Sequence, residues 1–415
     1  MVNKIYLIDV TNRDGVQTAK LGLSKLEKTM INLYLNEMGI FQSEFGFPTT
    51  RHEKNYLLAN LELVQMGVLK PIRLGGWIRA VAEDVELTFD RVPSIKHLNL
   101  SISTSDQMIN FKFRGKKNKS SIIKDMIAAV KLARKRGAES IGVNAEDASR
   151  TDINYLIEFG LAGKQYGADR LRYCDTLGYD NPFTIYEAAK ILAEKIKMPI
   201  ELHCHGDLGM AVANSIAGAK GVIDGGQDAY INTTINGVGE RAGNADLVAV
   251  ILALTKSKGF GDKYPLAGNI KLRLASKIGK FTSYAFDVPI PINQPGLGSN
   301  AFAHASGIHA DGVLKDPGNY ELYGYEELGR GEPISVETGR EIITGQYSGI
   351  SGFSHVMGKI DISFKNKSRE EANEILELVR YANVESHKPL VEDELEFIAK
   401  YPDITKKLLT MTPLE

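Results

Sequence analysis

Short apolar runs alternate with longer helical patterns along the first 275 residues of this chain. We expect a strand at each of eight runs: Ile5–Val10, Phe41–Phe45, Ile72–Leu74, His97–Ile102, Ser140–Val143, Arg170–Cys174, Ile200–His205 and Ala229–Thr233. Successive runs begin roughly 25 to 40 residues apart, which is the length of one strand–helix unit. After the first run, Ser24 and Glu27 predict a capping box at the start of a helix that Gly39 ends. The pattern predicts an α/β fold.

Polar side chains stand at or just after the end of nearly every expected strand. They are Asp14, Glu44, Arg79, Thr104, Glu146, Thr176, His203 with His205, and Asn244. A closed barrel gathers all eight carboxyl ends of its strands around one site, whereas an open sheet would disperse them. We therefore predict a (β/α)₈ TIM barrel over residues 1–275. The Pro-, Gly- and Asn-rich stretch 276–330 predicts an extended linker, and residues 331–415 a small C-terminal helical region.

Charge and cysteine content exclude several classes of protein. The formal net charge is −1, and no basic stripe points to nucleic acid or to a membrane surface. The start of the chain lacks the features of a signal peptide, and no run is long and apolar enough to span a membrane. Two cysteines, Cys174 and Cys204, are no disulfide framework and fit a reducing cytoplasm. We interpret the basic run Arg114–Lys119 as a solvated loop, with binding of an anionic cofactor tail as the functional alternative.

The segment ELHCHGDLG is the strongest local signal of chemistry. Residues two apart on a strand face the same side, so His203 and His205 point together into the barrel mouth. Two such imidazoles suit one divalent ion, although a hydrogen-bonded histidine pair would look the same. Asp14 follows the first strand, which only the eighth strand separates from the seventh, and can complete a two-histidine, one-carboxylate site. The alternative is a turn with a local ion pair between Arg13 and Asp14.

The other motifs supply candidates for supporting roles. Arg13 can polarise an oxygen of a metal-bound substrate. Asn244 ends the glycine-rich segment NGVGERAGN, in which we expect Glu240 and Arg241 to form a structural ion pair. Glu146 in a barrel mouth can act as an acid or base or support one. In the linker, His304, His309 and Tyr320 are candidate proton carriers, although a lone histidine in a loop is more often structural.

Seven motifs in this order resemble one family over about residues 5–330. They are TNRDGVQT, SEFGFP, NAEDASRTD, CDTLG, ELHCHGDLGMAVANS, NGVGERAGN and SGIHADGVLKDPGNYE. The family comprises the acetyl-CoA-dependent enzymes that condense 2-oxo acids, namely the homocitrate synthase and 2-isopropylmalate synthase family. The resemblance implies a metal-dependent Claisen condensation. Mn²⁺ would be the foremost metal, with Mg²⁺, Co²⁺ or Zn²⁺ as alternatives.

The resemblance also implies a role for each matching residue. Asp14, His203 and His205 would bind the metal, with Asn244 in or near the coordination sphere. Arg13 would stabilise charge on the ketone oxygen. His309, supported by Glu146 and Tyr320, would remove the proton from the acetyl group. In this family the linker acts across a homodimer, so His309 and Tyr320 would complete the partner subunit's site.

Departures from the family pattern bear on the acceptor acid. Asn12 and Val16 replace the usual Leu and Glu beside Arg13 and Asp14, and Gly142 stands where lysine-pathway homocitrate synthases carry Arg. The region after residue 368 is too short for a leucine-sensing domain, so we expect no leucine feedback through one.

Within the family, the pattern is most similar to citrate synthases of the Re type, whose acceptor is oxaloacetate. The alternatives are 2-oxoglutarate and the acceptors of isopropylmalate and citramalate synthases. We expect Arg79 to bind the far carboxylate of the acceptor, with Glu44 and Thr176 also contacting substrate. Outside this class the alternatives are an acyl-CoA lyase on the same barrel, an iron oxygenase and a catalytically silent metal-binding protein.

Overall fold

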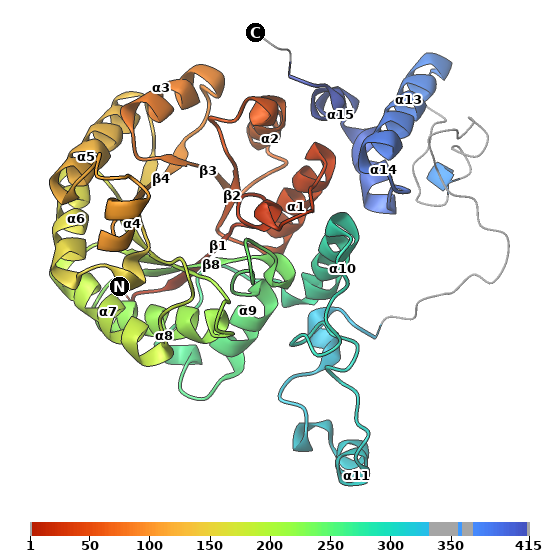
Figure 1. Cartoon of the computed structure of the whole chain (residues 1–415). Helices are drawn as coiled ribbons and strands as arrows, with labels where there is room; N and C mark the ends of the chain where they lie inside the picture. Colours follow the sequence, from red (N-terminus) through yellow and green to blue (C-terminus); the bar gives the residue numbers. More distant parts are fainter. Residues whose placement is uncertain (1, 332–355, 359–367, 413–415) are drawn as a thin grey trace.

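Eight parallel strands close into a barrel in chain order in the computed structural model, which describes residues 2–331, 356–358 and 368–412 (Figure 1). The strands are β1 (Ile5–Asp9), β2 (Gln42–Gly46), β3 (Arg73–Arg79), β4 (His97–Ser103), β5 (Ser140–Glu146), β6 (Arg170–Asp175), β7 (Ile200–Cys204) and β8 (Ala229–Thr233). The barrel closes where β1 pairs with β8, from Ile5 opposite Ala229 to Asp9 opposite Thr233. The predicted (β/α)₈ fold is confirmed.

An outer ring of helices covers the barrel. It consists of α1 (Lys25–Met38), α2 (Lys54–Gln65), α3 (Ala82–Arg91), α5 (Lys119–Lys135), α6 (Ile153–Tyr166), α7 (Pro182–Ile196), α8 (Ala211–Asp224) and α9 (Leu247–Lys256). The capping box of Ser24 and Glu27 opens α1, and Gly39 closes it with φ +90°. Leu26, Ile31 and Leu35 of α1 are buried in the hydrophobic core. No helix in the described part of the chain combines the length and apolar character needed to cross a membrane.

Strand β3 continues beyond the predicted end at Leu74. Gly75 and Gly76 lie inside the strand, where neighbouring side chains approach the backbone closely. A Cβ on Gly76 would stand 2.4 Å from Pro48 Cγ, and one on Gly75 would stand 2.5 Å from Gln42 Nε2. The glycines therefore mark close packing inside the strand and not its end.

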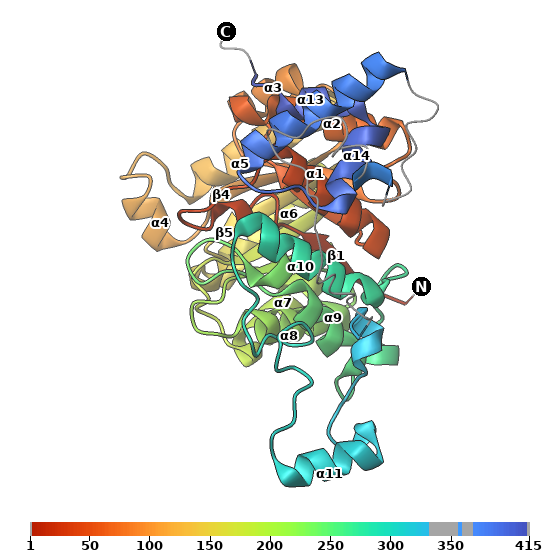
Figure 2. The ribbon, with the colours of Figure 1, turned by 90° about the vertical axis from the view of Figure 1, so that its right-hand side faces the viewer.

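The chain leaves the barrel through α10 (Ala275–Phe286) and enters the linker. In the linker, α11 (Gly307–Lys315) and a turn at Pro317–Asn319 project well away from the barrel (Figure 2). Three further helices, α13 (Arg369–Ser386), α14 (Glu392–Lys400) and α15 (Pro402–Leu409), pack against α1, α2 and α10. A hydrogen bond of 2.6 Å from Tyr34 to Asp393 ties α1 to α14. The predicted C-terminal helical region is confirmed where the structure describes it.

Candidate metal centre and active site

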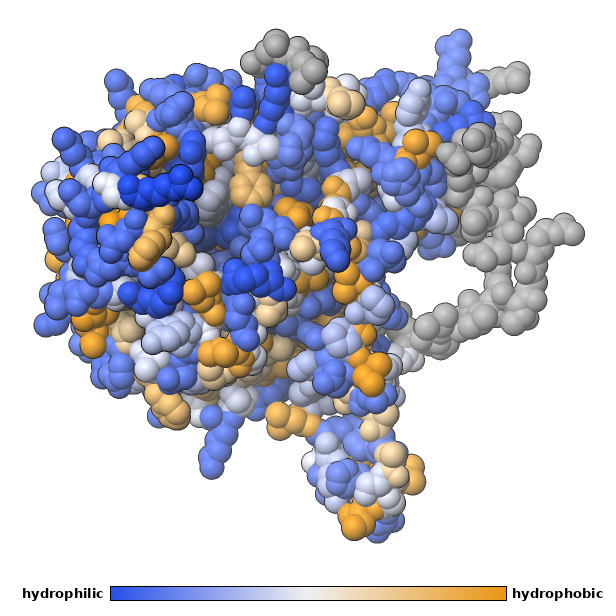
Figure 3. Space-filling model, in the orientation of Figure 1, coloured by the Kyte–Doolittle hydropathy of each residue, from blue (hydrophilic) through white to orange (hydrophobic). Residues whose placement is uncertain are grey.

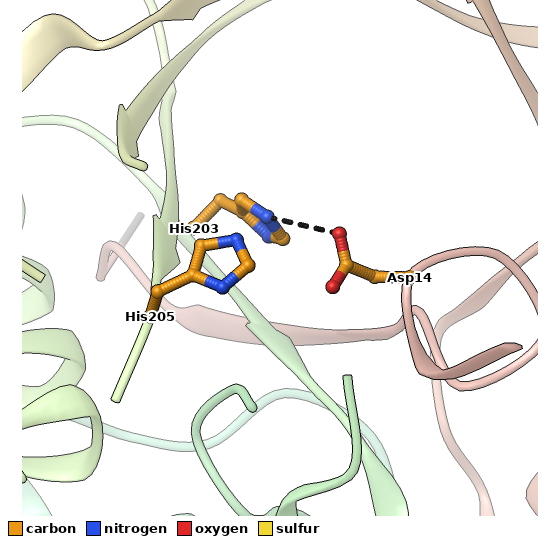
Figure 4. Close-up of side chains that lie close together, drawn as sticks. All are labelled: Asp14, His203 and His205. Atoms are coloured by element: carbon orange, nitrogen blue, oxygen red, sulfur yellow. Dashed lines mark ion pairs between the residues drawn. The ribbon is translucent and has the colours of Figure 1, made fainter. Parts of the chain in front are cut away.

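Asp14, His203 and His205 come together at the mouth of the barrel (Figure 4). One ligand atom from each residue can be chosen so that all lie within 4.8 Å of one another. His203 lies on β7 and His205 directly after it, so strand alternation turns both rings to one side, with centroids 4.9 Å apart. Asp14 follows β1, two strands away around the barrel, and its Oδ2 lies 3.6 Å from His203 Nε2.

The glycine-rich loop after β8 packs directly against this cluster. Asn244 donates a hydrogen bond of 2.7 Å to Asp14 Oδ1, and its backbone pairs with that of His205. Gly239 has φ +153°, and a Cβ there would lie 2.0 Å from Asn244 Nδ2. Glycine at this position therefore allows Asn244 to reach the acid.

The donor atoms of the cluster fit a divalent cation. In the described part of the chain, His203 Nδ1, His205 Nδ1 and Asn244 Oδ1 are buried without a hydrogen-bond partner. Burial raises the pKa of Asp14, but Arg13 and the two histidines outweigh it and hold the pKa well below its usual range. Burial, reinforced by His203, lowers the pKa of His205 to about 4. At neutral pH the site presents a carboxylate and a neutral imidazole, the forms that bind metals.

A cavity of about 220 Å³ opens beside the cluster. It is lined by Arg13, Asp14, Gln17, Phe47, Trp77, Ser101, Glu146, Arg172, Cys174, Thr176, His203, His205, Glu240 and Arg241. Phe47 and Trp77 meet edge to face at 5.8 Å and form an aromatic wall. Thr176 Oγ1 accepts a hydrogen bond of 2.9 Å from the Asp147 N–H, which leaves its hydroxyl hydrogen available to a ligand.

Glu146 stands at the edge of the same cavity as an ion-paired carboxylate. Lys112 Nζ contacts its two oxygens at 2.7 and 2.6 Å, and Ser103 Oγ donates to it at 2.5 Å. The predicted acid–base candidate therefore lies where a substrate in the cavity could reach it.

The HMGL-like family model matches residues 4–279, and the homocitrate synthase post-HMGL domain-like model matches residues 297–383. The chain belongs to the HMGL-like family. It is 72% identical to the Citrate (Re)-synthase of Dehalococcoides mccartyi, over 100% of this chain and 99% of that protein. It is 37% identical to 2-isopropylmalate synthase 2 of Caldanaerobacter subterraneus subsp. tengcongensis, over 97% of this chain and 96% of that protein. It is 32% identical to homocitrate synthase 1 of Nostoc sp., over 96% of this chain and 98% of that protein.

A solved HMG-CoA lyase from Brucella melitensis shares the fold of this HMGL-like chain. Its TM-score is 0.55 at 15% identity, over 69% of this chain and 99% of that one. At that identity the likeness shows the barrel alone. The predicted resemblance to the homocitrate synthase and 2-isopropylmalate synthase family is confirmed by the family models and the curated relatives.

Arg13 is fixed in this HMGL-like site by two carboxylates. Its Nη1 contacts Asp14 Oδ2 at 2.6 Å, and its Nε contacts Glu44 Oε1 at 2.5 Å. Glu44 is completely buried, lies outside the cavity lining and also binds Arg172 at 2.5 Å. The expectation was that Glu44 contacts substrate; in the structure its oxygens are occupied by Arg13 and Arg172, which line the cavity in front of it. Glu44 instead holds Arg13 in place.

Arg79 also lies outside the cavity, contrary to expectation. Its side chain is 68% exposed and contacts both oxygens of Asp84, at 2.6 and 2.8 Å. Asp84 lies in the first turn of α3, shortly after the end of β3, and binds the guanidinium of Arg79 outside the cavity. The expectation of an ion pair between Glu240 and Arg241 is likewise wrong. Arg241 has φ +56° and reaches Asp207 on the loop after β7, at 2.9 and 3.0 Å.

Neither His309 nor Tyr320 lines the cavity, and α11, which carries His309, projects away from the barrel of its own chain (Figure 2). Their rings stack on one another with centroids 4.2 Å apart, in and just after α11. His304 contacts Glu321 at 3.1 Å in the same segment. One chain alone thus brings together Arg13, Asp14, Glu146, Thr176 and the two histidines, but not the expected proton carriers.

Sequence reasoning missed a network of buried ion pairs behind the cavity, formed by Arg170, Arg172, Glu44 and Glu201. Arg172, which lines the cavity, contacts Glu201 at 2.5 Å, and Arg170 contacts the same acid at 2.5 Å. Burial raises the pKa of Glu44, but Arg172 and Arg13 lower it by more, so the resulting pKa is about 2. A signal was available, because Arg170 and Arg172 stand two apart on a strand with no solvent face.

Proposed function

We propose that this chain condenses acetyl-CoA with oxaloacetate and releases citrate and CoA, as a Re-type citrate synthase. The observation that carries the proposal is the 72% identity, along the whole chain, to a Citrate (Re)-synthase. The small cavity walled by Phe47 and Trp77 suits a short acceptor. We place the enzyme in the cytoplasm, since Cys174 and Cys204 are both free, buried thiols.

We propose that Asp14, His203 and His205 hold a divalent ion, Mn²⁺ foremost, with Asn244 beside it. Support comes from the unpartnered buried nitrogens and from the ionised Asp14. When bound, such an ion supplies Lewis-acid polarisation and orients a 2-oxo acid. The chain's own contribution is to bring these donors together in advance, with Asp14 ionised and His205 neutral.

Arg13 stabilises the negative charge that grows on the acceptor's ketone oxygen. Its guanidinium faces the cavity and is fixed by Asp14 and Glu44, so little reorganisation is needed when the charge appears. Thr176 donates its free hydroxyl hydrogen to an acceptor oxygen. Trp77, over which the Arg13 guanidinium stands at 5.6 Å, closes the site on one side.

A base must take a proton from the acetyl methyl group, and we assign this to His309 of the partner subunit in a homodimer. The segment around α11 exposes Ile308, Leu314 and Leu322 by 75%, 87% and 71%. Apolar side chains gathered on a projecting segment mark an interaction surface (Figure 3). Docked over a neighbouring mouth, this segment would bring His309 and Tyr320 to Glu146. The resulting carbanion attacks the ketone carbon, and the ketone oxygen takes up a proton to become the hydroxyl group. Water then cleaves the thioester, which gives the new carboxylate of citrate and releases CoA.

The acceptor is tested by following CoA release with a thiol reagent, using acetyl-CoA, Mn²⁺ and one 2-oxo acid at a time. We expect release with oxaloacetate. Release only with 2-oxoglutarate would make the chain a homocitrate synthase, and release with none of the family's acceptors would refute a condensing enzyme. Stereospecific enzymatic cleavage of citrate made from labelled acetyl-CoA then reports the face of addition.

The shared site is tested by mixing two inactive variants, His309→Ala and Asp14→Asn. If His309 acts in trans, one of the two sites in each mixed dimer keeps both residues. Random exchange gives half mixed dimers, so about a quarter of the wild-type activity should return. Mixed dimers that form, shown by two affinity tags, yet stay inactive would exclude a site shared in this way.

A further inference from the structure

The loop between β4 and α5 gathers positive charge at the mouth of the barrel. Residues 106–119 hold five lysines and arginines but a single acid, in a chain whose net charge is −1. Within this loop, α4 (Asp106–Phe111) stands out on the mouth side of the barrel (Figure 2). Strongly hydrophilic side chains crowd this part of the surface (Figure 3).

The loop is anchored to the candidate active site at one point. Lys112 binds both oxygens of Glu146, at 2.6 and 2.7 Å, and donates to Ser103 at 3.1 Å. Phe113 packs its ring against the hydrophobic core. The residues that follow, Arg114 to Lys116, are exposed and begin two positions after the lysine that touches the cavity's carboxylate. The charged loop therefore starts at the site and extends into solvent.

Most cations around the mouth are already neutralised, but two in this loop are not. Those of the neighbouring loops are paired with carboxylates: Arg79 with Asp84, Arg150 with Asp147 and Arg241 with Asp207. Within the loop, Lys117 pairs with Asp125 and Lys119 with Asp106. In the part of the chain that the structure describes, Arg114 and Lys116 have no carboxylate partner. Phe111, 70% exposed, is the last residue of α4 and precedes Arg114 by three positions.

We infer that Arg114 and Lys116 bind the phosphate groups of CoA, with Phe111 offering a flat apolar surface to the adenine. This rests on the proposed function, which places the thioester end of acetyl-CoA beside Glu146. The diphosphate and 3′-phosphate must then lie further out, in the direction in which the loop runs from Lys112. Guanidinium and ammonium groups bind phosphate oxygens by charge-assisted hydrogen bonds, and aromatic side chains stack on bases.

The test measures binding by calorimetry, without acceptor or turnover. The probes are CoA and dephospho-CoA, which lacks the 3′-phosphate, and the variant is Arg114→Gln with Lys116→Gln. The matched control is Lys135→Gln with Lys195→Gln, which removes two exposed charges from the last turns of α5 and α7, at the opposite end of the barrel. Circular dichroism melting checks that both proteins are folded.

We expect the loop variant to bind CoA roughly tenfold more weakly than wild type and to lose most of the preference for CoA over dephospho-CoA. The control should keep wild-type values for both probes. Equal weakening in both variants would show a general charge effect and overturn the assignment, as would wild-type binding by the loop variant. If the wild-type enzyme binds no CoA at all, the proposed function itself fails.

Discussion

Replacing Glu44 by Gln removes one charge from the centre of a buried ionic cluster. Glu44 is completely buried and contacts Arg13 and Arg172, both at 2.5 Å. Glutamine keeps the shape, but its amide N–H groups would face guanidinium donors and its charge is gone. The substitution therefore leaves one positive charge uncompensated inside the barrel.

Two independent estimates give the cost. The arginines lower the pKa of Glu44 from 4.5 to about 2, and a difference of that size corresponds to about 3 kcal/mol of folding free energy. Removing one partner of a buried ion pair typically costs about 3 to 5 kcal/mol. We expect the free energy of unfolding at pH 7 to fall by about 3 to 4 kcal/mol. Because the folded pKa is depressed, this stabilisation is present above pH 4.5 and is lost as the pH falls toward 2.

Urea unfolding followed by circular dichroism measures this loss, with Glu139→Gln as the control. Glu139 is 64% exposed and lies 3.5 Å from Lys96, so its replacement should cost less than about 0.5 kcal/mol. Glu44→Gln should also lower kcat, because the Nε–H of Arg13 loses its charged acceptor, and Glu44→Asp should restore part of it. A loss of stability below about 1 kcal/mol in Glu44→Gln would refute the reasoning from buried charge.

Three further outcomes follow from the structure. His205→Ala should stay folded but lose bound metal in elemental analysis; full metal content would remove His205 from the ligand set. Arg79→Gln should change the KM for oxaloacetate less than about twofold, since Asp84 holds Arg79 outside the cavity; a tenfold rise would restore its predicted role. Burial raises the pKa of Glu394 to about 7, so the contribution of this one group to folding stability is fully present below pH 4.5 and is lost as the pH rises through 7. Glu394→Gln should therefore raise the melting temperature at pH 8 but not at pH 4, and an equal effect at both would contradict this.

The barrel could be predicted from the sequence because a repeated pattern specifies it many times over. Each strand is a short apolar run, and closure explains why polar residues follow nearly all of them. The prediction failed at β3, where Gly75 and Gly76 look like the end of a strand and lie inside it. The close neighbours that require glycine there, Gln42 and Pro48, come from another part of the chain. Local pattern alone could not supply that reason.

The convergence of Asp14, His203 and His205 could be predicted for the same kind of reason, whereas the position of Arg79 could not. Strand alternation sets the direction of His203 and His205, and the order of strands sets the nearness of Asp14. Arg79 has a long side chain at the end of a strand, and the direction of that side chain depends on which carboxylate lies within its reach, here Asp84. That choice belongs to tertiary structure and is invisible in the residue types.

The network of buried ion pairs around Arg170, Arg172, Glu44 and Glu201 could itself have been inferred from the predicted fold. Charges two apart on a strand normally indicate a solvent face, but both faces of a strand in a parallel barrel are covered. Once the barrel is predicted, Arg170, Arg172 and Glu201 must therefore be paired inside it. The observed cluster balances three arginines, including Arg13, against Asp14, Glu44 and Glu201. Arg13 thus faces the cavity as part of a network that crosses the barrel, so its position depends in part on Glu44 and Glu201, which lie outside the cavity lining.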